Sequence, residues 1–146
     1  MNLSHRIHIL IILSLIGLLQ VTTSMAQTDA SVQARTDATE VLVGDQVKLF
    51  IEAQHNSKQS RMQWAVLQDT FNSLEIVEKG KIDTVANGDI VTYKQRLLVT
   101  GWDSGSFVLP AFQFTVIPAS GIPYALQTDS FILNVSTVPV DTTQPF

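Results

Sequence analysis

Apolar and polar residues alternate along most of the chain after Val32, which is the pattern of half-buried β-strands. The alternation is clearest in Gln46 to Gln54, whose apolar face holds Val47, Leu49, Ile51 and Ala53. Phe50 interrupts the polar face of that segment. No window of about twelve residues shows the 3.6-residue apolar period of an amphipathic helix. The pattern therefore predicts an all-β protein.

Turn-forming residues divide the chain into short predicted strands. Asn87-Gly88 is the clearest signal, because a type I′ hairpin needs positive φ at both central residues and this pair tolerates it best. Gly44-Asp45 predicts a turn, and His55 to Arg61 and Pro118 to Pro123 predict polar loops. The other predicted strands are Val32 to Arg35, Glu40 to Val43, Met62 to Leu67, Leu74 to Lys79, Lys81 to Ala86, Asp89 to Thr100, Ser106 to Ile117 and Tyr124 to Val138. About seven to nine short strands at regular spacing predict an antiparallel β-sandwich.

One segment narrows this prediction to an immunoglobulin-like sandwich. Asp103 to Leu109 has the layout of the Asp-x-Gly-x-Tyr-x-Cys corner that opens one strand of such domains. Phe107 stands in the tyrosine position, and Leu109 stands in the position of a bridging cysteine. The alternative is that Asp103 to Gly105 forms an ordinary turn.

The expected core of this sandwich is apolar throughout. Trp64 lies on a predicted strand where immunoglobulin-like folds bury a tryptophan between the sheets. Leu49 or Ile51 takes the place of the first cysteine, opposite Leu109. We therefore expect Leu49, Ile51, Trp64, Phe107 and Leu109 to meet between two layers and to replace the disulfide.

The N-terminus has the parts of a secretory signal peptide. Arg6 supplies a positive charge, and Ile7 to Leu19 is a nearly unbroken apolar run of thirteen residues. That run is shorter than the about 20 apolar residues that cross a bilayer. Ser24-Met25-Ala26 matches the small-any-small cleavage pattern, so we expect Gln27 to begin the mature chain, with an uncleaved anchor as the alternative. Both readings place the protein outside the cytoplasm, in the periplasm or cell envelope.

Composition supports one exported domain without disulfides. The expected organisation of the 146 residues is a signal peptide at 1–26, one β-domain at 27–138 and a linker or truncated tail at 139–146. The chain has no cysteine, so its stability has to come from a packed core. Loss of Arg6 with the signal changes the net charge from −4 to −5, and no basic block is present. This charge distribution argues against nucleic acid and anionic membrane surfaces as partners.

Reactive side chains are sparse in the sequence. His55 is the only histidine beyond the predicted signal peptide, and cysteine is absent, which excludes tetrahedral zinc sites and Cys–His nucleophiles there. We expect His55 to be a solvated loop residue rather than the base of a Ser–His–Asp arrangement. The sequence therefore predicts no catalytic, cofactor-binding or metal-binding residues and no enzymatic activity.

Two groups of carboxylates are better explained by structure than by chemistry. Glu75 and Glu78 lie on one predicted strand, but their odd spacing sends them to opposite faces, unlike the paired acids of a glycosidase. Asp37, Glu40 and Asp45 could offer oxygen ligands to calcium. They lie near the first turns, where such residues favour turn and capping roles.

Trp102 and Tyr124 are the candidate contact residues. Trp102 adjoins the corner at Asp103, and Tyr124 follows the predicted loop from Pro118 to Pro123. Exposed together, these two rings would stack on a sugar or anchor a protein partner, because tryptophan and tyrosine dominate interface hot spots. Burial of the tryptophan in the core is the alternative.

Several segments carry a resemblance to a known family. They are Gly105 to Phe112, Pro123 to Ser130, Leu133 to Val135 and Val43 to Val47. Together they resemble the extracytoplasmic β-domain of BatD-like proteins of the Bacteroidetes type, over most of the mature chain. The resemblance implies a membrane-anchored protein associated with aerotolerance operons and with partners of von Willebrand factor A type, without established catalytic residues.

The chain departs from that family at its C-terminus. It ends at Phe146, without the later domains or the membrane anchor of the family. We therefore expect a fragment or a truncated reading frame. Membrane contact is expected only through an uncleaved signal or a missing C-terminal anchor.

Two functional hypotheses follow from these observations. The first is a non-catalytic extracytoplasmic interaction or structural module, whose exposed sheet edge or loop end docks an envelope protein. The second is a carbohydrate-binding or adhesion module that uses Trp102 and Tyr124. An enzyme is the third reading, for which the sequence offers few candidate acids, bases or nucleophiles.

Overall fold

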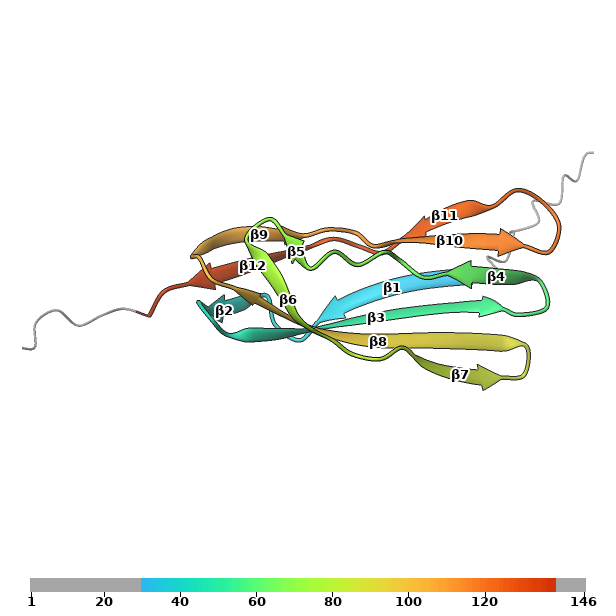
Figure 1. The fold of residues 1–146 in the computed structure, drawn as a ribbon, viewed down its shortest axis with the longest axis horizontal. Helices are drawn as coiled ribbons and strands as arrows, with labels where there is room; N and C mark the ends of the chain where they lie inside the picture. Colours follow the sequence, from blue (N-terminus) through green and yellow to red (C-terminus); the bar gives the residue numbers. More distant parts are fainter. Residues whose placement is uncertain (1–29, 139–146) are drawn as a thin grey trace, which may run out of the picture.

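The regular elements of the protein are all β-strands. The computed structural model describes residues 30–138, so the predicted signal peptide at 1–26 and the predicted tail at 139–146 lie outside the described residues. Within that range the chain contains strands, turns and bends but no helix (Figure 1), which confirms the all-β prediction. No helix able to cross a membrane occurs among these residues.

Twelve strands form three sheets in residues 30–138. The six-stranded sheet has the order β1 (Ala30–Thr36), β3 (Gln46–Asn56), β8 (Ile90–Gly101), β6 (Leu74–Lys79), β5 (Thr70–Phe71), and β7 (Asp83–Asn87) also pairs with β8. The second sheet has the order β11 (Tyr124–Gln127), β10 (Gln113–Pro118), β4 (Ser60–Gln63). The third has the order β2 (Glu40–Leu42), β12 (Phe131–Ser136), β9 (Gly105–Leu109). The strand pairs are antiparallel, except that β2 runs parallel to β12.

β4 and β9 to β12 lie over the face of β1, β3 and β8 and form a second layer, toward which β6 and β5 curl (Figure 1). One cluster of buried apolar side chains fills the space between the layers. The apolar face predicted for β3 is confirmed, because its four residues are each at most 1% exposed. The second layer and β8 complete the core with Leu97, Val99, Leu109, Phe114 and Leu133, which are equally buried.

The five apolar residues expected to meet in the core either belong to it or pack against it. Leu49, Ile51 and Leu109 belong to the buried cluster, and Trp64 and Phe107 pack against it with part of their surface exposed. The two layers are therefore held together at this point by side-chain packing alone, since the chain has no cysteine.

A polar contact at the edge of the core also joins the two layers. The indole N–H of Trp64 donates to Gln95 Oε1 at 2.9 Å. Gln95 in turn donates from Nε2 to the carbonyl oxygen of Gly80 at 2.7 Å. The Trp64 ring meets the Phe114 ring edge-on, with centroids 4.9 Å apart. Trp64 is thus fixed by β8 on one side and by β10 on the other.

The loop predicted from His55 to Arg61 is mostly strand in the structure. β3 continues through Asn56 and β4 begins at Ser60, so only residues 57–59 turn. The reason is that His55 continues the inward-facing alternation of β3 and is 3% exposed. β4 then ends at Gln63, so the prediction of a strand centred on Trp64 is wrong.

Two long predicted strands, Ser106 to Ile117 and Tyr124 to Val138, are each divided in the structure. β9 and β12 belong to one sheet, whereas β10 and β11 belong to another, so the chain changes sheets inside each predicted strand. Pro110 lies at the first break and has no N–H with which to continue a ladder. At the second break Thr128 Oγ1 accepts from the N–H of Phe112 at 3.0 Å, and the Thr128 N–H donates to the Phe112 carbonyl at 3.1 Å. These breaks and the added β5 raise the number of strands above the predicted range.

The hairpin predicted at Asn87-Gly88 is confirmed, but its loop begins one residue later. Asn87 pairs with Ile90, so the two-residue loop is Gly88-Asp89. Gly88 has a φ of +60°, while its two neighbours do not have positive φ. Positive φ at the first loop position alone is typical of a type II′ turn, in which glycine is preferred there.

A β-bulge corrects the prediction for Glu75 and Glu78. The pairing of β6 with β8 shifts between Ile76 and Glu78, so Glu75 lies opposite Thr100 and Glu78 opposite Leu98. Residues two apart on β8 share a face. The two glutamates therefore lie on the same outer face of the six-stranded sheet rather than on opposite faces.

The two ends of the described chain lie at opposite ends of the molecule (Figure 1). Ala30 pairs with His55 near the last residue of β3. Ser136 pairs with Leu42, shortly before the first residue of β3. The strands therefore run roughly along the line that joins the two ends.

Leu109→Ala tests whether the core replaces the missing disulfide. Leu109 is 0% exposed, so its truncation should lower the free energy of unfolding by about 2–5 kcal/mol in urea titrations. The neighbouring Val108→Ala is the matched control, because Val108 is 48% exposed and should cost less than about 0.5 kcal/mol. Equal losses in the two variants would contradict a core centred on Leu109.

Candidate functional site

Trp102 has the most exposed aromatic ring among residues 30–138, at 59% exposure. Its indole N–H donates to Glu75 Oε2 at 2.8 Å. The ring also packs over Gly44, where an added Cβ would lie 3.8 Å from Trp102 Cζ3. These contacts from two neighbouring segments fix the orientation of the indole, while most of its surface remains open to solvent.

The turn that supports Trp102 depends on Gly44, whose φ of +85° disfavours residues with a Cβ. The N–H of Gly44 donates to the carbonyl of Gly101 at 3.0 Å, which joins the turn to the end of β8. The same turn carries Leu42 and Val43, which are 41% and 37% exposed. We call Leu42, Val43 and Trp102 the Trp102 patch. Exposed apolar groups gathered in this way commonly mark interaction sites.

Two of the three acidic residues near the first turns, Asp37 and Asp45, have the structural roles that the sequence predicts. Asp45 Oδ2 accepts from the N–H of Leu42 at 3.0 Å and closes the turn. Asp37 Oδ1 accepts from the N–H of Lys48 at 2.8 Å. Neither these residues nor any others in the described part of the chain gather into a group that could hold a metal ion.

Tyr124 lies far from Trp102, at the other end of the molecule. Trp102 follows β8 next to the start of β3, where Gln46 pairs with Thr100. Tyr124 begins β11 and pairs with Val116 on β10, beside the start of β4. The 11 residues of β3 separate the two places by roughly 33 Å. Tyr124 is 38% exposed, so both rings are accessible, but the structure does not bring them together.

Glu75 and Glu78 lie on the same face of the sheet but contact different partners. Glu75 holds the Trp102 indole, as described above. Glu78 Oε1 instead lies 3.2 Å from Arg96 Nη2 in an exposed ion pair. Each carboxylate is thus engaged by its own partner, and the arrangement is not the facing pair of acids that glycoside hydrolysis uses.

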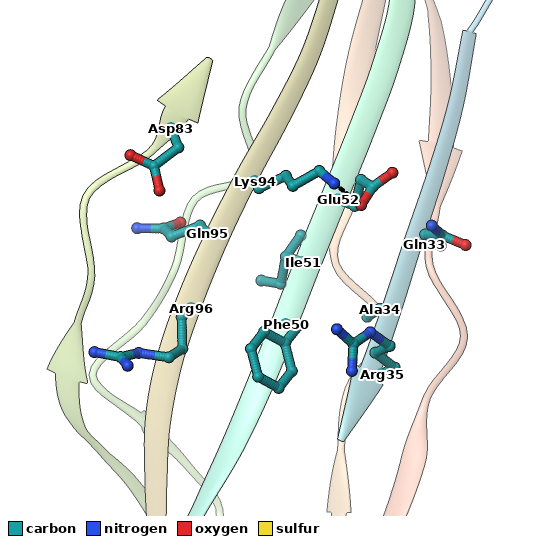
Figure 2. A pocket seen from close by; sticks show the side chains of 10 residues that line it. All are labelled: Gln33, Ala34, Arg35, Phe50, Ile51, Glu52, Asp83, Lys94, Gln95 and Arg96. Carbon is teal, nitrogen blue, oxygen red and sulfur yellow. Dashed lines mark ion pairs between the residues drawn. The ribbon is translucent and has the colours of Figure 1, made fainter. Parts of the chain in front are cut away.

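A cavity of about 250 Å³ lies on the outer face of the six-stranded sheet. Figure 2 shows the side chains that line it. Phe50 lies in it, and the guanidinium Cζ of Arg35 is 4.2 Å from the centre of the Phe50 ring. Lys94 Nζ and Glu52 Oε2 form an ion pair at 3.1 Å, which Figure 2 marks. The cover by Arg35 explains why a phenylalanine interrupts the polar face of β3. Because these charges are already engaged, the cavity is a weaker candidate site than the Trp102 patch.

His55 forms a polar network inside the core instead of standing in solvent. Its Nδ1 lies 3.3 Å from Ser60 Oγ, and its Nε2 lies 3.4 Å from the Tyr93 hydroxyl. Its ring stacks on the Tyr93 ring with centroids 5.8 Å apart. Ser60 Oγ also donates to the carbonyl of Asn56 at 3.3 Å. The network joins β3, β4 and β8, so the prediction of a solvated loop histidine is wrong.

The network is closed to a substrate. Ser60 Oγ lies 3.3 Å from both the Asn56 carbonyl and His55 Nδ1, so its proton can serve either bond. Ser60 is also 4% exposed, which keeps a substrate away from its hydroxyl.

Sequence reasoning found Trp102 but missed its support. Glu75 lies 27 positions earlier in the chain and Gly44 lies on another turn, so no local pattern connects them to Trp102. The network around His55 was missed for the same reason, because Tyr93 lies 38 positions away from the histidine. The one local signal for this network was that His55 continues the alternation of inward-facing residues along β3.

Comparison of the chain with models of known protein families and with curated proteins found no match.

Ser60→Ala tests the network around His55. The change leaves the buried Nδ1 of His55 without its partner, so the free energy of unfolding should fall by about 1–3 kcal/mol. Chemical denaturation followed by tryptophan fluorescence measures this loss. Ser120→Ala on an exposed loop is the control and should change stability by less than about 0.5 kcal/mol. A loss no larger than that of the control would show that Ser60 does not satisfy the histidine.

Proposed function

We propose that this protein is a non-catalytic, extracytoplasmic interaction module with an immunoglobulin-like β-sandwich fold, and that it binds a protein partner through the Trp102 patch. Support for the sandwich comes from the two layers, from the burial of Leu109 and from the packing of Trp64 against the core. Support for export comes from Arg6, from the apolar run of Ile7 to Leu19 and from the cleavage pattern Ser24-Met25-Ala26.

The observation that carries the proposal is the fixed and exposed indole of Trp102. A side chain that is already held in one rotamer loses little conformational entropy when a partner covers it. The bond to Glu75 and the contact with Gly44 provide that restraint before any partner arrives. Tryptophan is also the residue type most enriched among interface hot spots. The exposed Leu42 and Val43 on the neighbouring turn add apolar surface that suits a protein partner.

The partner proposed from the BatD-like resemblance is an envelope protein of von Willebrand factor A type. The resemblance rests on Gly105 to Phe112 and on the other segments quoted for it, which are turn and core residues rather than contact residues. It adds the expectation of membrane anchoring. The Trp102 patch is where we place the contact with that partner.

Carbohydrate binding is the second candidate, and the exposure of Trp102 is the observation that favours it. A sugar-binding platform commonly needs polar groups that converge around the ring. Here Glu75 is engaged with the indole itself, and Tyr124 lies at the other end of the molecule. The protein partner is therefore the better proposal.

Trp102→Ala should abolish capture of the partner. Affinity capture from cell-envelope extract of the source organism, followed by quantitative mass spectrometry, compares this variant with the unchanged protein. Loss of a hot-spot tryptophan should weaken binding about thirtyfold or more. Glu75→Leu, which frees the indole, should weaken binding about threefold to tenfold, whereas Glu75→Gln keeps an acceptor and should bind nearly as well.

Tyr124→Ala is the matched control, because it removes an exposed aromatic ring at the other end of the molecule. It should leave the captured proteins unchanged. The proposal fails if no captured protein depends on Trp102. Binding to a glycan array that depends on Trp102, without a captured protein, would favour the carbohydrate-binding alternative instead.

A further inference from the structure

β7 is an unprotected sheet edge. It is the only strand within residues 30–138 in which every residue is exposed, and Val85 at its centre is 55% exposed. It pairs with β8 on one side and with no described strand on the other. Edge strands are usually protected against further pairing by lysine, proline or a bulge. β7 itself contains none of these, because its sequence is Asp-Thr-Val-Ala-Asn.

Backbone hydrogen bonds show which groups of β7 point away from β8. Arg96 O accepts from the N–H of Gly80 at 2.9 Å, so even-numbered residues of β8 direct their backbone groups toward β6 and β7. The N–H of Asp37 donates to Lys48 O at 3.1 Å, so even-numbered residues of β3 face β1 and odd-numbered residues of β3 face β8. Their partners on β8 are odd-numbered too, so the odd-numbered residues of β8 face β3. Since the partners of Thr84 and Ala86 on β8 have odd numbers, these two residues direct N–H and C=O outward.

We propose that β7 pairs antiparallel with β7 of a second copy of this chain, around a two-fold axis that passes between the two Val85 residues. Thr84 then forms a hydrogen-bonded pair with Ala86 of the second copy, and Ala86 forms one with Thr84 of that copy. Val85 meets its own counterpart as a non-hydrogen-bonded pair, in which side chains approach most closely. The six-stranded sheets of both copies become one continuous sheet.

This register pairs all five residues of β7 and places no like charges opposite each other. Asp83 falls opposite Asn87 of the second copy, and Thr84 falls opposite Ala86. A shift by two positions in either direction would leave two residues of each β7 strand unpaired.

This edge is separate from the Trp102 patch, so the inference goes beyond the proposed function. β7 joins its hairpin at Gly88-Asp89, at the end of the sheet where β3 finishes. Trp102 lies at the opposite end of β8. Self-pairing through β7 leaves the Trp102 patch of each copy free. The self-pairing proposal can therefore fail while partner binding by the Trp102 patch holds, and the reverse.

Val85→Cys tests the two-fold axis, because the natural chain has no cysteine that could interfere. A non-hydrogen-bonded pair holds its Cα atoms about 4.5 Å apart, a distance at which a disulfide can close. Under mild oxidation the full-length Val85→Cys variant should form covalent dimers about tenfold faster than Val66→Cys. Val66 is the control because it lies on a loop and is 89% exposed. Asp83→Cys mixed with Asn87→Cys should form the mixed dimer in preference to either symmetric one.

Ala86→Pro tests the hydrogen bonds without cross-linking. It removes one outward N–H from each copy but leaves the ladder with β8 intact. Sedimentation equilibrium should show the dissociation constant of the dimer rising about tenfold, while Ala86→Ser, which keeps the N–H, should match the unchanged protein.

The proposal is overturned if Val85→Cys cross-links no faster than Val66→Cys, or if the symmetric Asp83→Cys and Asn87→Cys dimers dominate. If Ala86→Pro fails to fold, the cysteine variants decide the question alone. Loss of dimers in Ala86→Pro with unchanged capture by Trp102 would confirm that the two surfaces act independently.

Discussion

The packing of β3 and β8 against the second layer is the constraint on which the rest of the structure depends. Without cysteine, no disulfide joins the layers. They stay together because packing between them removes apolar side chains from water. Leu49 and Ile51 from one layer and Leu109 from the other carry this contact near its centre. The turns that carry Trp102 and the hairpin that carries β7 are positioned only because this core is closed.

Polar contacts then give the core a unique arrangement. The bonds from Trp64 to Gln95 and from His55 to Ser60 each connect β4, or the residue after it, to the six-stranded sheet. Buried polar groups that find partners in only one packing penalise every alternative packing. A stable frame of this kind lets Trp102 stand in solvent with a fixed orientation, which is what a binding residue needs.

The strand pattern and the core face were predictable because they depend on neighbours in the sequence. The alternation in β3 and the turn chemistry of Gly44 and Gly88 are local, and the structure confirms strands and turns there. The changes of sheet at Pro110 and Thr128 and the bulge after Ile76 depend on strands that are distant in sequence. The support of Trp102 by Glu75 is likewise a contact between strands, so the residue could be found but its preorganisation could not.

The places where β1 begins and β12 ends have a mechanical consequence. They lie at opposite ends of the long axis (Figure 1), and β12, the last described strand, is held between β2 and β9. Tension applied between these ends acts nearly parallel to the strands, so the backbone hydrogen bonds on both sides of β12 would share the load in shear. A domain loaded in this way resists pulling more strongly than one whose terminal strand peels away bond by bond.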